Sequence, residues 1–175
     1  MENTQVSAKK IIINYGLLLG IVSVVFGVIL YVTDSYMDQN WMHSLIGFLI
    51  LIGAIVYGIK AYKTANGGFL TLGEGIKVGI GIALVGGLIS VVWTLLLMQV
   101  IEPDMMERMA EVSREKMQEQ YPDFTQEQLD QSAAMAEKFS SPFIISAFSL
   151  LFNLFFGFIF ALIASLVMQK KQTFN

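Results

Sequence analysis

The side chains best suited to chemistry are one histidine and several methionines that could together hold a soft metal ion. His43 is the only histidine, and it could act with Met37 or with the group Met105, Met106 and Met109. Imidazole and thioether ligands suit copper. One histidine without any cysteine is thin support, however, and methionines at helical spacing usually pack. We therefore expect no metal and no cofactor, and we place His43 in an aromatic belt at a membrane interface.

Glu74 and Lys77 are charges beside an apolar stretch, and an ion pair inside a membrane would by default indicate a functional site. The same region matches a capping box, in which the Thr71 hydroxyl and the Glu74 carboxylate each bond a backbone N–H at a helix start. The Lys77 side chain is long enough to reach lipid headgroups. We therefore expect a helix cap and an anchor.

Three further polar residues are candidates for contact with a substrate. Asn153 is the most polar residue in the middle of any apolar stretch, and Lys60 and Lys63 follow the second stretch. The lysines could meet a phosphate headgroup. The amide could hold a substrate or bond a neighbouring helix, as polar side chains in membranes do. Interhelical contact is the favoured interpretation for Asn153, with substrate contact as the alternative.

Other kinds of chemistry find little support in the sequence. The chain has no cysteine, which excludes disulfides, zinc thiolate sites and thiol nucleophiles. It shows no serine–histidine–acid arrangement and no glycine-rich phosphate loop. The net charge is −3, and no basic cluster suits nucleic acid. We predict that the chain is not an enzyme and does not bind nucleic acid.

Four long apolar stretches must position these residues. They predict membrane spans at about 11–32, 41–59, 75–101 and 143–168, because about 20 apolar residues cross the hydrocarbon core of a bilayer. The first two links are short, and short links make neighbouring helices antiparallel. We predict a single membrane domain over residues 1–175, an all-α antiparallel bundle of four transmembrane helices.

The charges are sorted between alternate gaps of this bundle. The side with both termini carries seven positive and two negative charges, and the other side carries four positive and twelve negative charges. Cytoplasmic segments of membrane proteins are enriched in lysine and arginine. The sorting predicts a multi-pass protein of the cell inner membrane with both termini in the cytoplasm.

The link at about 103–140 is long, acidic and rich in helix formers. Thr125 and Gln128 match a capping box, and Pro122 interrupts the segment. We predict a two-helix hairpin on the outer side, hinged near Pro122, between the third and fourth spans. A disordered acidic tether is the alternative, because the charge is high.

Small residues recur at helical spacing along three of the spans. Lipid supplies no hydrophobic force between helices, so close backbone approach must hold the bundle together. Helix packing is the favoured role, with a substrate groove or a homodimer face as alternatives. The residues concerned are Gly16, Gly20, Gly27, Gly79, Ala83, Gly87, Gly157 and Ala161.

The most distinctive segment covers the link between the second and third spans. A Tyr-Lys pair leads to a double glycine, an aromatic residue and a helix that opens with a Lys-x-Gly pattern. The residues that carry this pattern are Tyr62, Lys63, Gly67, Gly68, Phe69, Lys77 and Gly79.

This segment and the architecture around it resemble a family of small bacterial four-span membrane proteins, domain of unknown function 4199. The resemblance implies a fold and a bacterial inner membrane, and it implies no activity or catalytic residue. One departure is Leu72-Gly73-Glu74, which stands where an aromatic-Gly-Gln sequence is expected.

Together these features favour a non-enzymatic scaffold or accessory subunit of a membrane complex. Its expected partners are the lipid bilayer and either another membrane protein or a second copy of the chain. The alternative is a component of a transporter or flippase for a small substrate or a polyprenyl-linked lipid. Genes like those of the resembled family are associated with polyprenyl-phosphate glycosyltransferases. The spans lack the buried charges and broken helices that mark many transporter sites.

Overall fold

A computed structural model describes residues 8–36, 38, 40–139 and 141–171. The secondary structure of this part is helical, apart from one isolated backbone bridge between Leu70 and Lys170. The elements are α1 (Ala8–Val32), α2 (Trp41–Ala65), α3 (Leu72–Leu96) with its π-helical continuation η1 (Leu97–Ile101), α4 (Met105–Gln120), α5 (Gln126–Phe139) and α6 (Pro142–Met168). The all-α prediction is therefore confirmed for the described residues.

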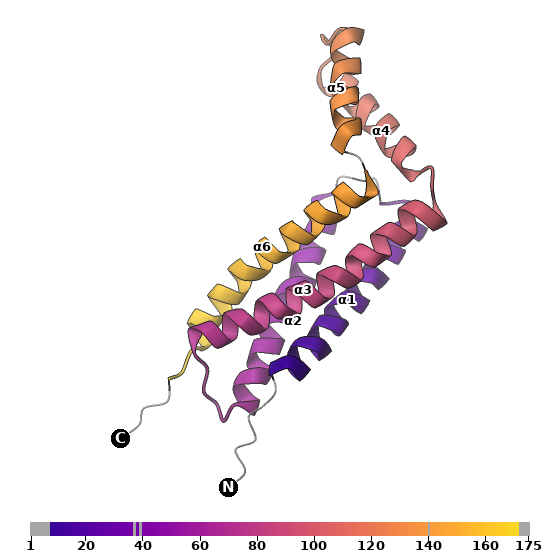
Figure 1. The fold of residues 1–175 in the computed structure, drawn as a ribbon. Coiled ribbons are helices and arrows are strands. Elements are labelled where there is room, and N and C mark those ends of the chain that lie inside the picture. Colours follow the sequence, from indigo (N-terminus) through magenta and orange to yellow (C-terminus); the bar gives the residue numbers. More distant parts are fainter. Residues whose placement is uncertain (1–7, 37, 39, 140, 172–175) are drawn as a thin grey trace.

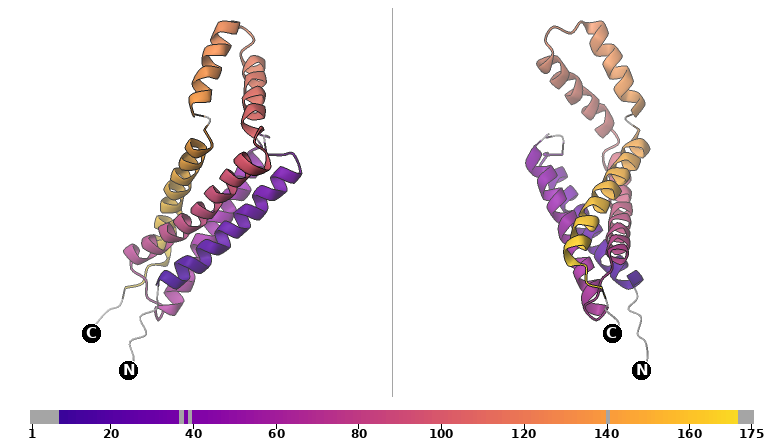
Figure 2. Two further views of the ribbon diagram at one scale, coloured as in Figure 1. Left: turned by 45° about the vertical axis from the view of Figure 1, so that its right-hand side comes forward. Right: turned by 90° about the vertical axis from the view of Figure 1, so that its left-hand side faces the viewer.

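Four of these helices, α1, α2, α3 with η1, and α6, are long and apolar enough to cross a membrane. They form an elongated bundle in which α3 packs along both α1 and α6, while α2 completes the bundle with lighter contacts to all three (Figure 1). The start of α1 and the end of α6 lie at the same end of the bundle, which we call the inner end. Helices α4 and α5 project from the opposite end, which we call the outer end (Figures 1 and 2).

The outside of the bundle is apolar. Only 17% to 28% of the most hydrophobic window of each long helix is buried inside the structure. Large side chains such as Phe155 and Val167 are 59% and 80% exposed. A soluble monomer rarely shows contiguous apolar surface of this extent. Lipid chains are the environment that such an exterior fits, since helices satisfy their own backbone hydrogen bonds.

The long helices extend beyond the apolar stretches that predicted them. Helix α2 continues to Ala65, so Lys60 and Lys63 lie on its last turns, and α1 begins at Ala8. An absence of charge marks the part of a helix that suits hydrocarbon. The helix itself continues as long as its backbone bonds are satisfied, and lysine side chains can reach out toward headgroups from its ends.

Specific residues end α2 and begin α3. Gly67 and Gly68 have φ of 68° and 84°, in the left-handed region that glycine enters at little cost. The Gly68 N–H donates to the Lys63 carbonyl at 2.9 Å, a typical closure of a helix C-terminus. Thr71 then caps α3 in a complete capping box with Glu74, as the sequence predicted.

Helices α4 and α5 pair through an ion pair between Arg114 and Asp130 with an N–O distance of 2.7 Å. The Thr125 N–H donates to the Gln128 side chain at 2.9 Å, and the Gln128 N–H donates to the Thr125 hydroxyl at 3.3 Å, so the predicted capping box is present at the start of α5. Ser141 occupies the N-cap position of α6 and Pro142 its first turn, but the Ser141 side chain makes no capping hydrogen bond.

Candidate functional site

Asn153 lies in the middle of α6 and faces α3. Its Nδ2 donates to the Ala83 carbonyl at 2.7 Å. Gly87 makes room for this contact, because a Cβ at position 87 would lie 2.7 Å from the same nitrogen. The amide therefore joins two helices through a hydrogen bond, an interaction that averages about 0.6 kcal/mol inside membranes.

The small residues meet other helices of the same chain. Gly16, Gly20 and Gly27 of α1 lie against Val85, Ile89 and Trp93 of α3. On the other side of α3, Gly79 lies against Ala161, and a Cβ at Gly157 would come within 2.6 Å of Ala83. Two close seams therefore run along α3, one with α1 and one with α6. In both seams the small residues contact helices of the same chain. They are therefore covered and do not form a face for a second copy.

Lys63 and its neighbours form a set of contacts at the inner end of the bundle, which we call the inner latch. The Lys63 Nζ donates to the Met168 carbonyl at 2.7 Å, near the negative end of the α6 dipole. Leu70 and Lys170 exchange two backbone hydrogen bonds of 2.9 Å. The Lys170 Nζ also lies 5.7 Å from the centre of the Phe69 ring. The distinctive segment thus binds the end of α6 to the α2–α3 link.

Glu74 completes the inner latch. Its carboxylate accepts hydrogen bonds from the Thr71 N–H at 2.8 Å and from the Tyr62 hydroxyl at 3.2 Å. Tyr62 is 8% exposed. In the described part of the chain no ion pair joins Glu74 to Lys77, whose side chain is exposed. The Glu74 carboxylate therefore completes the capping box at the start of α3 and accepts a hydrogen bond from the buried Tyr62 hydroxyl.

The three candidate substrate contacts are not brought together. Asn153 and the Lys63 acceptor at Met168 are separated by 15 residues of α6, or roughly 22 Å at the helical rise. Lys60 lies one turn before Lys63 on α2, is exposed, and makes no hydrogen bond or ion pair among the described residues. Of the three candidates, Lys60 is therefore the one whose side chain has no bonded partner within the described structure.

The methionines near the outer end are packed into a second apolar cluster, here called the outer cluster. Leu97, Met98 and Met105 are 0%, 3% and 1% exposed. Partly buried side chains surround them, namely Tyr31, Tyr36, Trp93, Met106, Met109 and Ile145. Burial raises the pKa of the Tyr36 phenol. The cluster joins the first turns of α4 to α1, α3 and α6.

Arg108 adds a polar connection across the outer cluster. Its guanidinium pairs with Glu102, and it reaches Asp34 in the α1–α2 link at 3.4 Å. These carboxylates raise the pKa of Arg108. Asp34 is held at φ 54°, a left-handed conformation that aspartate tolerates better than most residues. The base of α4 is thereby tied to two links of the bundle.

His43 is not near a group of metal ligands in the described structure. Its ring packs edge-on against the ring of Phe26, with the two ring centres 6.5 Å apart. Met105 is buried in the outer cluster, and Met37 lies outside the described residues. Across those residues no set of three histidine, aspartate or glutamate side chains is placed to hold a metal ion.

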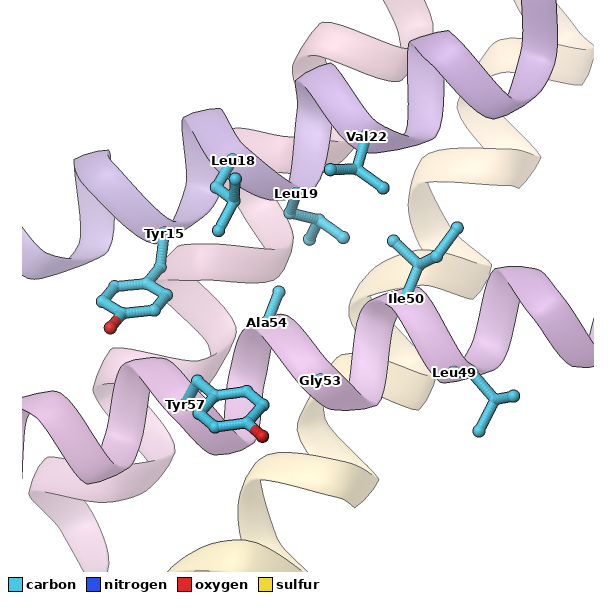
Figure 3. A pocket seen from close by; sticks show the side chains of 9 residues that line it. All are labelled: Tyr15, Leu18, Leu19, Val22, Leu49, Ile50, Gly53, Ala54 and Tyr57. Carbon is cyan, nitrogen blue, oxygen red and sulfur yellow. The ribbon is translucent and has the colours of Figure 1, made fainter. Parts of the chain in front are cut away.

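A groove with a volume of about 270 Å³ opens between α1 and α2 (Figure 3). Its walls come from one face of each helix, and we call it the α1–α2 groove. The residues that line it are Tyr15, Leu18, Leu19, Val22, Leu49, Ile50, Gly53, Ala54 and Tyr57. Sequence reasoning missed this groove, because no periodic pattern reports how far apart two helices stand.

A bundle of four long apolar helices, with apolar side chains outward and a polar helix pair at one end, indicates a multi-pass membrane protein. The model of a family described as "Protein of unknown function (DUF4199)" matches residues 14–170, and the chain belongs to this family. The predicted family resemblance is therefore confirmed. No curated protein and no solved structure matches the chain.

Proposed function

We propose that the chain spans a bacterial inner membrane with both termini in the cytoplasm and the α4–α5 hairpin outside. The charge distribution supports this orientation. Lys60, Lys63 and Lys170 lie toward the inner end, whereas ten acidic residues lie between Glu102 and Glu137. Lysine and arginine are enriched on the cytoplasmic side of membrane proteins.

In this orientation the protein acts as a non-enzymatic scaffold or accessory subunit whose contact surface is the α4–α5 hairpin. The supporting observation is the hairpin tip, which stands away from the bundle (Figure 2). There Tyr121 and Phe124 stack with ring centres 4.8 Å apart, and they remain 51% and 39% exposed. Exposed aromatic side chains commonly anchor protein interfaces.

The surroundings of the tip indicate the charge of the partner. Glu119 precedes the aromatic pair in the sequence, Asp123 lies between its two members, and most other charges of the hairpin are acidic. A complementary surface would be basic, since matched charge speeds encounter and sets specificity. The outer cluster and Arg108 hold the base of the hairpin against the bundle. A partner bound at the tip would therefore be held at a defined place above the membrane.

Transport of a small substrate or a polyprenyl-linked lipid is the alternative role, and two contacts weigh against it. Asn153 is engaged by Ala83, and Lys63 is engaged by Met168. A transporter would have to break both contacts to use these side chains.

Site-specific photo-crosslinking in living cells tests the scaffold proposal. A photoreactive residue replaces Phe124 at the tip or, as control, Val167, which is 80% exposed at the inner end of α6. We expect one discrete crosslinked product from position 124 that position 167 does not give. A protein that remains an uncrosslinked monomer in native membranes from both positions would overturn the proposal.

A further inference from the structure

The α1–α2 groove is apolar over most of its length and opens toward the side of the bundle. Leu18 and Val22 form the α1 wall, and Ile50 stands opposite on α2 (Figure 3). Gly53 leaves the floor open, because a Cβ at that position would meet no atom within 4 Å. From Tyr15 to Val22 the groove follows α1 for roughly 10 Å at the helical rise. This shape suits a segment of an acyl chain.

The inner end of the groove is polar. Tyr15 and Tyr57 both stand there and carry the only hydroxyl groups among the lining side chains (Figure 3). Lys60 follows Tyr57 by three residues, so the two side chains are neighbours on one face of α2. Lys60 is exposed and unpaired within the described part of the chain. A free cation therefore stands beside the polar end of an apolar groove.

We propose that this groove binds one acyl chain of an anionic phospholipid from the inner leaflet, with the lipid phosphate at Lys60. The leaflet follows from the orientation proposed above, and the site itself goes beyond the scaffold role. The cytoplasmic leaflet is rich in anionic lipid, and each lysine at its surface adds attraction.

A lipid fits the groove better than a second copy of the chain does. A second copy would need an acidic group to meet Lys60. Among the described residues, the acid at the inner end of the bundle is Glu74. Glu74 is already bonded to Thr71 and Tyr62.

Two pairs of matched variants test the proposal. Gly53→Leu fills the groove, whereas Gly47→Leu adds the same side chain elsewhere on α2, where a Cβ also meets nothing within 4 Å. Lys60→Gln removes the free cation. Lys77→Gln is its control, because Lys60 and Lys77 are both exposed and both lie five residues from the inner end of their helices.

Each full-length variant is reconstituted into nanodiscs of equal phosphatidylglycerol and phosphatidylcholine, and native mass spectrometry counts the lipids that stay bound after release. We expect one phosphatidylglycerol on the natural protein, lost in Gly53→Leu and kept in Gly47→Leu. Lys60→Gln should weaken retention about five-fold, the contribution of one lysine near an anionic surface, and Lys77→Gln should not.

Equal retention in the two glycine variants would overturn the groove as the site. Equal retention of both lipids, or no effect of Lys60→Gln, would overturn the anionic headgroup. A dimer that Gly53→Leu dissociates without changing the lipid count would assign the groove to a second copy instead. Lipid retention is measured without regard to sidedness, so its failure would leave the proposed orientation and hairpin contact intact.

Discussion

The two ends of the bundle are held together by different forces. At the inner latch, hydrogen bonds join the end of α2, the start of α3 and the end of α6, and several involve backbone atoms. At the outer end, methionines and aromatic rings pack around Leu97, and the polar connection is the exposed Arg108. Hydrogen bonds specify one geometry, whereas methionine-rich packing tolerates adjustment. The contacts at the inner end thus specify one geometry, whereas the packing at the outer end holds the base of the hairpin and tolerates small adjustments.

Of the variants that separate the two ends, Met105→Ala should have the largest effect, and that effect should be confined to the outer end. The side chain is 1% exposed at the centre of the outer cluster, and truncating a buried methionine costs on the order of 2–5 kcal/mol. We expect the hairpin to separate from the bundle while the inner latch stays intact. Hydrogen exchange should speed up in α4 and remain unchanged at 62–75. Faster exchange at both ends would mean that they are not independent.

A smaller effect is expected from Glu74→Ala at the inner latch. This change removes the carboxylate half of the capping box and leaves the Tyr62 hydroxyl without its acceptor, at a cost of about 1–3 kcal/mol. Hydrogen exchange should speed up at 70–75 and not in the hairpin. Glu74→Gln is the matched control, because glutamine also completes a capping box. If Glu74→Gln behaves like the alanine variant, the carboxylate charge and not the cap holds the latch.

The smallest effect should come from Arg108→Gln. The guanidinium is about half-exposed and Asp34 is 88% exposed, although Glu102 is only 17% exposed. Salt therefore screens much of the attraction between these charges. We expect a modest increase in protease cleavage of the hairpin at low salt that disappears at about 1 M salt, where the Debye length is about 3 Å. An effect that persists at high salt would show that Arg108 holds the hairpin by packing.

The sequence predicted the features that depend on local order or on periodicity. The Thr71 and Thr125 caps need only residues three positions apart, and the long helices need only composition. The contacts that tie the ends together were not predictable in this way. Lys63 meets a carbonyl 105 residues away, and Arg108 meets a carboxylate 74 residues away. Such pairs follow from how the helices are stacked, which no single segment encodes.

Local sequence order also does not show which of the candidate polar residues are already bonded to another helix. Asn153, Lys60 and Lys63 were grouped because polar residues are rare in apolar helices, yet their partners differ in kind. Asn153 and Lys63 bond backbone carbonyls, whereas Lys60 has no partner within the part of the chain that the structure describes. Chemical type alone could not separate them, because burial and the position of a neighbouring helix decide whether a polar group is already satisfied.

The π-helical turn at Leu97–Ile101 contains one residue more than an α-helical turn would need. Its bond from the Glu102 N–H to the Leu97 carbonyl, 2.8 Å long, spans five residues where an α-helix spans four. With one residue fewer the turn would close as an ordinary α-helix, and the start of α4 would move by about 100° around the helix axis. A one-residue deletion here would therefore change the direction in which the α4–α5 hairpin leaves α3.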